Sequence, residues 1–125
     1  MPLSYEIDRE RRLVITTALE TVTGSEALVF QGRLGSDDRF NAEFSHLVDL
    51  TRLTSVDIDV ATMTELAARP VHANSRRAFV VGLNRLAYSM SRMFIALTRV
   101  TGEEQMRVFE DRNEALQWLG ILGNR

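Results

Sequence analysis

Apolar residues recur along the chain with two alternating periods, one typical of strands and one typical of helices. Short apolar runs bounded by polar turns predict strands, and apolar residues three or four positions apart predict helices. The predicted strands are residues 5–7, 13–18, 45–49, 77–82 and 105–109, and the predicted helices are residues 24–34, 60–69, 83–97 and 112–122. Strands and helices therefore alternate after an amino-terminal pair of strands.

Polar residues mark where several of these elements begin. The charged turn 8–12 joins the first two strands as an antiparallel hairpin. Thr23 and Glu26 have the spacing of a capping box at a helix start, and Asp111 and Glu114 repeat this spacing before the last helix. These local signals agree with the hydrophobic pattern.

The order of elements is β-β-α-β-α-β-α-β-α, which predicts an α/β fold with a mixed sheet. Residues 77–82 carry a continuous apolar run rather than an alternating one, so we expect a central strand that is buried on both faces. Each helix has an apolar face that the sheet must cover. With 125 residues and no linker between its elements, the chain is predicted to form one domain, residues 1–125.

The composition excludes several classes of protein. The chain has no cysteine, which excludes disulfides, thiolate zinc sites and thiol nucleophiles. No apolar run approaches the roughly 18 residues of a membrane span, and the first residues lack the pattern of a signal peptide. We therefore expect a cytoplasmic protein without membrane insertion.

The charges are distributed unevenly along the chain. The formal net charge is -2, yet residues 66–102 contain six arginines and no acidic residue. This basic segment can meet an acidic partner or face the acidic elements of the same molecule. The acidic overall balance argues against nucleic acid as a partner, because phosphate binding needs a basic face with aromatic residues beside it.

The segment 46–59 carries the most specific pattern in the chain. An apolar strand leads to Asp49, a short turn is expected to follow, and Asp57 and Asp59 stand where the next helix begins. This layout resembles the STAS domain of anti-sigma factor antagonists, which has the SpoIIAA-like fold. In that family a serine directly after the second aspartate is phosphorylated to switch partner binding. Ile58 stands at this position, so the resemblance implies the fold but withdraws the phosphorylation switch.

The resemblance extends over nearly the whole chain. An amino-terminal hairpin followed by alternating helices and strands is similar to the SpoIIAA-like family, and residues 108–119 resemble the strand, capped turn and alanine-rich helix that close the fold. The match is closer to the poorly characterised bacterial SpoIIAA-like proteins, whose superfamily fold has some likeness to lipid-binding CRAL-TRIO domains. The resemblance implies a non-enzymatic regulatory or protein-interaction module.

The acids Asp49, Asp57 and Asp59 are candidate site residues at the expected switch loop. Gathered at the carboxyl end of the sheet, their oxygens would suit a divalent cation. We favour the structural alternative, in which Asp59 caps the second helix, Asp57 braces the turn and Asp49 accepts hydrogen bonds from nearby backbone amides. His46 and His72 have no spacing that predicts a shared metal or a proton relay. We expect no metal site, no cofactor and no enzymatic activity.

Basic and apolar residues share one stripe of the predicted helix 83–97 and its end. The candidate interface consists of Arg85, Tyr88, Arg92, Ile95 and Arg99, which we place away from the leucine and methionine face. Arginine and tyrosine are favoured interface anchors, so this stripe is a candidate docking surface for a foreign protein or for a second copy in a homodimer. The alternative is an ordinary solvent-exposed face.

Met90, Met93 and Phe94 suggest a different function. Flexible thioethers can line an adaptable apolar cavity for a lipid-like ligand. Packing of the helix against the sheet is the favoured explanation of the same spacing. Two functional classes therefore remain, an interaction module and a carrier of a small apolar ligand.

Overall fold

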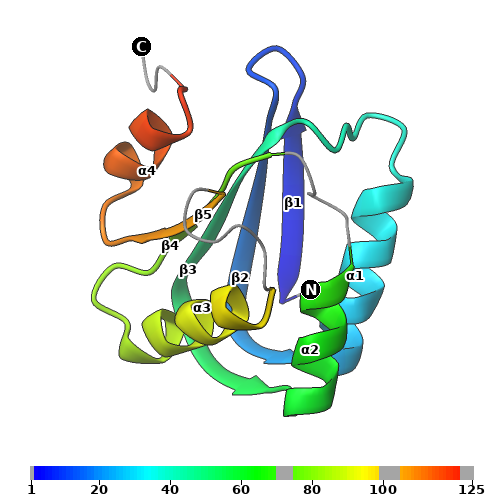
Figure 1. The fold of residues 1–125 in the computed structure, drawn as a ribbon, viewed down its shortest axis with the longest axis vertical. Helices are drawn as coiled ribbons and strands as arrows, with labels where there is room; N and C mark the ends of the chain where they lie inside the picture. The colour runs from blue at the N-terminus through cyan, green and yellow to red at the C-terminus, as the bar shows by residue number, and fades with distance from the viewer. Residues whose placement is uncertain (1, 70–74, 99–104, 122–125) are drawn as a thin grey trace.

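The computed structural model describes residues 2–69, 75–98 and 105–121. Within these segments the chain forms five strands and four helices in the predicted order (Figure 1). The strands are β1 (Leu3–Asp8), β2 (Leu13–Thr23), β3 (Ser45–Asp57), β4 (Arg77–Val80) and β5 (Met106–Phe109), and the helices are α1 (Gly24–Ser36), α2 (Val60–Ala68), α3 (Arg85–Thr98) and α4 (Arg112–Trp118). No helix in these three segments is both long enough and apolar enough to cross a membrane.

The strands form one mixed sheet in the order β1-β2-β3-β4-β5. β1 and β2 make the predicted antiparallel hairpin, and every later pair of neighbours is parallel. β4 lies between β3 and β5, and its residues Ala78, Phe79 and Val80 are all buried. The continuous apolar run of this segment is thus explained by an interior strand that is covered on both faces.

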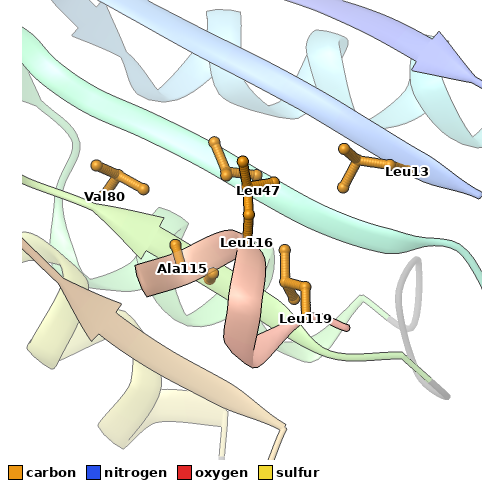
Figure 2. Close-up of a cluster of buried hydrophobic side chains, with 7 residues drawn as sticks. Leu13, Leu47, Val80, Ala115, Leu116 and Leu119 are labelled. Carbon is orange, nitrogen blue, oxygen red and sulfur yellow. The ribbon is translucent and has the colours of Figure 1, made fainter. Parts of the chain in front are cut away.

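The helices cover the two faces of the sheet unequally, because neighbouring residues of a strand point to opposite faces. One face packs against α4 through a cluster of seven buried residues, most of them labelled in Figure 2: Leu13, Leu47, Ala78, Val80, Ala115, Leu116 and Leu119. On the opposite face, Val14 packs with Leu34 of α1, and Phe79 packs with Phe94 of α3. This second face, which α1, α2 and α3 cover, carries the candidate site.

The predicted helix caps are largely confirmed. Thr23 and Glu26 make a complete capping box at the start of α1. Asp59 caps α2 by accepting a hydrogen bond from the Thr62 amide at 2.8 Å. Asp111 also caps α4, but it accepts from the Asn113 amide at 3.0 Å instead of the third amide of the helix that a capping box uses.

β2 and β3 are longer than the hydrophobic pattern predicts. The register between them shifts near Leu19 and Glu20, and Glu20 adopts a left-handed backbone with φ of 59°. Beyond the shift the two strands continue as a ribbon that curves away from β4 (Figure 1). Most of the added residues of β3 are exposed, so they lack the apolar alternation that would have identified a strand.

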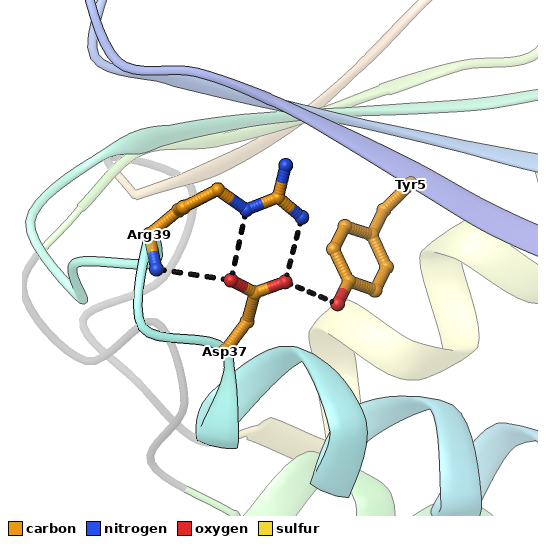
Figure 3. A network of polar contacts seen from close by, with 3 residues as sticks. All are labelled: Tyr5, Asp37 and Arg39. Carbon is orange, nitrogen blue, oxygen red and sulfur yellow. Dashed lines mark hydrogen bonds and ion pairs between the residues drawn. The ribbon is translucent and has the colours of Figure 1, made fainter.

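Asp37, the residue after α1, ties the end of this helix to β1. Its carboxylate accepts a hydrogen bond from the Tyr5 hydroxyl at 2.7 Å and two from the Arg39 guanidinium at 2.8 and 3.0 Å (Figure 3). The Arg39 guanidinium, followed by the Tyr5 hydroxyl, holds the pKa of Asp37 well below its ordinary value. The same hydrogen bond to Asp37 raises the pKa of Tyr5.

Candidate functional site

Three polar side chains form a row across the face of the sheet that α1, α2 and α3 cover. Thr16, His46 and Arg77 come from the adjacent strands β2, β3 and β4, and His46 is the register partner of Arg77. Thr16 Oγ1 and His46 Nε2 lie 2.6 Å apart, which makes a hydrogen bond between two buried side chains. The otherwise apolar layer therefore has a polar end where β3 and β4 begin.

Arg77 brings a positive charge into this layer. Its guanidinium carbon lies 5.4 Å from the centre of the Phe94 ring of α3, which is cation–π distance. Its Nε is buried and has no hydrogen-bond partner among the described residues. Burial lowers the pKa of Arg77 to about 10, so the side chain still carries its charge at neutral pH. The five ion pairs between described residues involve other arginines.

A pocket of about 180 Å³ lies between this face of the sheet and the helices. Thr16, His46 and Arg77 all contribute to its lining. Most of the wall is apolar and comes from β3, α2 and α3, with Leu50, Leu53, Met63, Leu66, Met90 and Phe94 among the lining residues. Among the described residues that line it, none is acidic. The arrangement is an apolar pocket with one cationic end.

Two further polar side chains reach the pocket from the helices. Ser91 of α3 donates its hydroxyl to the Ala87 carbonyl at 2.8 Å, so its hydrogen-bonding capacity is largely used within the helix. Gln31 of α1 donates its amide nitrogen to the Leu66 carbonyl at 3.1 Å, which ties α1 to the end of α2. The Gln31 Oε1 is buried without a partner in the described part of the chain. The pocket thus offers a ligand a buried donor on Arg77 and a buried acceptor on Gln31.

The sequence identified only part of this lining. Met90 and Phe94 line the pocket, as the ligand-carrier hypothesis requires, whereas Met93 is 45% exposed and does not. Thr16, Gln31 and Arg77 were not singled out. The available signal was Arg77 itself, because an arginine opens the strand whose other residues are all buried. His46, which the sequence gave no partner, pairs with Thr16 because the sheet register brings the two together.

The expected switch loop does not exist in this fold. Asp49 and Asp57 both lie in β3, where the sequence was expected to turn. Eight residues of extended strand separate them by more than about 20 Å. The described residues contain no group of three acids or histidines that could hold a metal. The idea that Asp49, Asp57 and Asp59 gather at one site is therefore wrong.

The structural interpretation holds for two of these acids. Asp49 accepts hydrogen bonds from the Thr51 amide at 3.0 Å and the Thr51 hydroxyl at 2.7 Å, and it pairs with Arg112 of α4 at 3.5 Å. Asp59 is the cap of α2. Asp57 ends β3 and is exposed, so it braces no turn. Ile58 lines the pocket and packs beside Leu53, which shows why an apolar residue occupies this position.

The stripe proposed on α3 is only partly correct. Arg85, Tyr88 and Arg92 are exposed, and Tyr88 keeps 51% of its surface in solvent. Ile95 is instead partly buried against the cluster of Val48, Phe79 and Met106. Arg99 lies outside the described residues. The exposed surface on α3 thus comprises Arg85, Tyr88 and Arg92, and Ile95 belongs to the core.

Small residues explain why the face of α3 was misplaced. The innermost positions of the helix are Ala87 and Ser91, which are both buried. Counting only large apolar residues rotated the predicted face toward Leu83 and Met93. Leu83 precedes the helix and is 90% exposed. A close approach of helix and sheet favours small side chains at the contact, and these carry little hydrophobic signal.

A second hollow lies where β4 and β5 end. It is lined by the turn before α3 and by the first residues of that helix, including Gly82, Leu83 and Tyr88. Gly82 has φ of 59°, and a Cβ there would lie 3.3 Å from Thr51 Cγ2, so the tight turn favours glycine. Asn84 fixes the turn by donating to the Leu53 carbonyl at 2.7 Å and accepting from the Ala87 amide at 3.1 Å.

Comparison with known proteins identifies the fold. No protein-family model matches the chain, and no curated protein matches it. Among solved structures it is similar to an uncharacterised protein of the DUF3478 family with a SpoIIAA-like fold from Shewanella loihica PV-4. The two share 20% sequence identity with a TM-score of 0.63, over 94% of this chain and 91% of the other. The SpoIIAA-like fold that the sequence predicted is confirmed, and the likeness carries the fold alone.

Proposed function

We propose that this protein is a non-enzymatic binding protein that holds a small apolar ligand in the pocket between the sheet and helices α1, α2 and α3. The observation that supports the proposal is the pocket itself, with a volume of about 180 Å³ and mainly apolar walls. Protein interiors are normally packed without such spaces. An engineered apolar cavity of about 150 Å³ in another protein stays dry and binds benzene.

The volume limits the ligand to a small molecule. A ligand of about ten non-hydrogen atoms, at roughly 0.5 kcal/mol per atom, would bind with a Kd of about 0.2 mM. Walls of methionine and leucine can adapt to different shapes, so we expect tolerance toward the form of the apolar part. Such binding suits a sensor or carrier of an abundant small molecule.

Binding rather than catalysis is favoured by the chemistry of the lining. Among the described residues that line the pocket, His46 is the group that ordinarily titrates near neutral pH, and none is a carboxylate. General acid and base catalysis usually combines at least two groups with matched pKa values. We therefore propose that Thr16 and His46 serve as hydrogen-bonding groups in a cytoplasmic binding protein.

Titration with n-octanol, monitored by amide chemical shifts of the labelled protein, tests the proposal. We expect saturable shifts at lining residues such as Leu53, Met63 and Met90. Ala27→Leu, which adds volume to a lining position, should weaken the binding, and Ala61→Leu on the exposed side of α2 should not. Absence of saturable shifts, or equal binding by the two variants, would refute a ligand site in this pocket.

A second candidate function is docking of another protein, or of a second copy, on the hollow beside α3. The observation that favours it is the exposure of Leu83 and Tyr88 next to Arg85 at the carboxyl end of β4. Ligand and partner sites of α/β folds often lie at this end of the strands. Light scattering of wild type and Tyr88→Glu tests self-association, and a monomer in both cases would exclude the homodimer.

A further inference from the structure

We infer, building on the function proposed above, that the ligand is a short apolar monocarboxylate and that Arg77 binds its carboxylate. Among the described residues of its lining, Arg77 is the cationic side chain, and apart from Thr16, His46, Gln31 and Ser91 the wall is apolar. A molecule with one negative group and a short hydrocarbon part, such as octanoate, matches both properties.

The charge of Arg77 favours a negatively charged ligand. Arg77 is partly buried and its Nε is fully buried, and withdrawing a cation from water is costly unless an anion or several hydrogen bonds compensate for the lost water. In the described part of the chain, the contact found for this guanidinium is the ring of Phe94. The carboxylate of a bound ligand would bring a negative charge to this guanidinium.

The geometry of the Arg77 guanidinium also favours a carboxylate. A guanidinium presents its N–H groups in a planar fork that matches the two oxygens of a carboxylate. Arg77 Nε, one of these donors, is buried without a partner in the described residues, and Arg77 itself lines the pocket. His46 and Thr16 lie on the same face of the two neighbouring strands, where they add hydrogen-bonding groups beside the carboxylate.

The size of the pocket favours a ligand with a short hydrocarbon chain. A chain of eight carbons is roughly 10 Å long, which equals about three residues of a strand. Starting beside Arg77 and its neighbour His46, such a chain would run past Val48, which lies two residues further along the same face of β3 and lines the pocket. A phospholipid exceeds about 180 Å³ many times over, and a phosphate dianion would require more than one cation. A short monocarboxylate therefore fits better than either.

Gln31 provides the competing possibility. Its Oε1 is an acceptor that is buried without a partner among the described residues, so a neutral alcohol could donate to it. The two possibilities predict that different ligands bind more tightly. Contact with Arg77 favours octanoate over octanol, and contact with Gln31 favours octanol.

Isothermal titration calorimetry of the full chain at pH 7.5 with octanoate, n-octanol and octylamine tests the inference. We expect wild type to bind octanoate at least about tenfold more tightly than octanol, as one charge-assisted hydrogen bond provides, and octylamine most weakly. Arg77→Met should abolish this preference while keeping octanol binding. Arg92→Met, which removes an exposed arginine of α3, should change nothing.

The outcomes separate the inference from the proposed function. If wild type binds octanol and octanoate equally, the inference is wrong and the apolar binding site stands. If it binds neither, the proposed function fails and the inference fails with it. A preference for octanoate that persists in Arg77→Met would overturn the role of Arg77. Should that variant not fold, the ratio measured on wild type still decides the ligand class.

Discussion

Replacing Arg77 with methionine is expected to leave the protein as stable as wild type or to stabilise it. Burial lowers the pKa of Arg77 to about 10, well below the ordinary value of an arginine. This difference corresponds to about 3 kcal/mol by which the folded environment disfavours the charge. The cation–π contact with Phe94 stabilises the folded protein by about 2 kcal/mol at most. The balance predicts a gain of at least about 1 kcal/mol when the charge is removed.

Thermal unfolding followed by circular dichroism at pH 7 measures this effect. For a chain of 125 residues, about 1 kcal/mol corresponds to a rise in Tm of about 4 °C. Arg107→Met is the matched control, because its guanidinium carbon lies 5.7 Å from the Trp118 ring at an exposed position. Losing that contact costs about 0.5–1 kcal/mol, so the control should lower Tm.

The two variants are thus expected to shift Tm in opposite directions. A fall in Tm for Arg77→Met that equals or exceeds the fall for Arg107→Met would refute the reasoning. It would mean that the buried charge is compensated within the protein. Arg77 would then be a structural residue rather than one kept at a cost in stability for a ligand.

Four further substitutions test the packing and the polar network. Leu116→Ala should lower the free energy of unfolding by about 2–5 kcal/mol in urea, because Leu116 is buried in the α4 cluster, and a loss below about 1 kcal/mol would contradict that role. Ile95→Glu should cost more than about 2 kcal/mol, and Tyr88→Glu less than about 0.5 kcal/mol, so similar effects of the two would place Ile95 on the surface. Asp37→Asn should destabilise the protein at pH 7, where the Arg39 ion pair is formed. Because the pKa of Asp37 is lowered in the fold, its contribution is fully present above about pH 4 and shrinks as the pH falls below that value. The difference between urea melts of variant and wild type should therefore be smaller at pH 2.5 than at pH 7, and an unchanged difference would contradict the pairing.

The order of elements could be predicted because each of them has a local signal. The capped starts of α1 and α2 depend on residues within one helical turn, so Thr23 and Asp59 were identified correctly. The continuous run 77–82 placed β4 inside the sheet. The far ends of β2 and β3 could not be predicted, since exposed strand residues have no apolar alternation.

The candidate site was harder to predict because it depends on contacts between distant segments. Thr16, His46 and Arg77 are 30 and 31 positions apart along the chain, and only the register of β2, β3 and β4 brings them together. The hydrophobic pattern predicted the wrong inner face of α3, because the buried residues there, Ala87 and Ser91, are small and add little to such a pattern. A pocket is also defined by the volume that side chains leave unfilled, which no periodicity in a sequence reports.

The most direct test of the account is a crystal structure of the protein grown with octanoate at several times its measured Kd. We predict electron density for the ligand in the pocket, with its carboxylate at hydrogen-bond distance from the Arg77 guanidinium and its chain against Val48. Density for ordered water in place of the hydrocarbon chain, or octanoate bound only outside the pocket, would contradict an apolar binding site between the sheet and helices α1, α2 and α3.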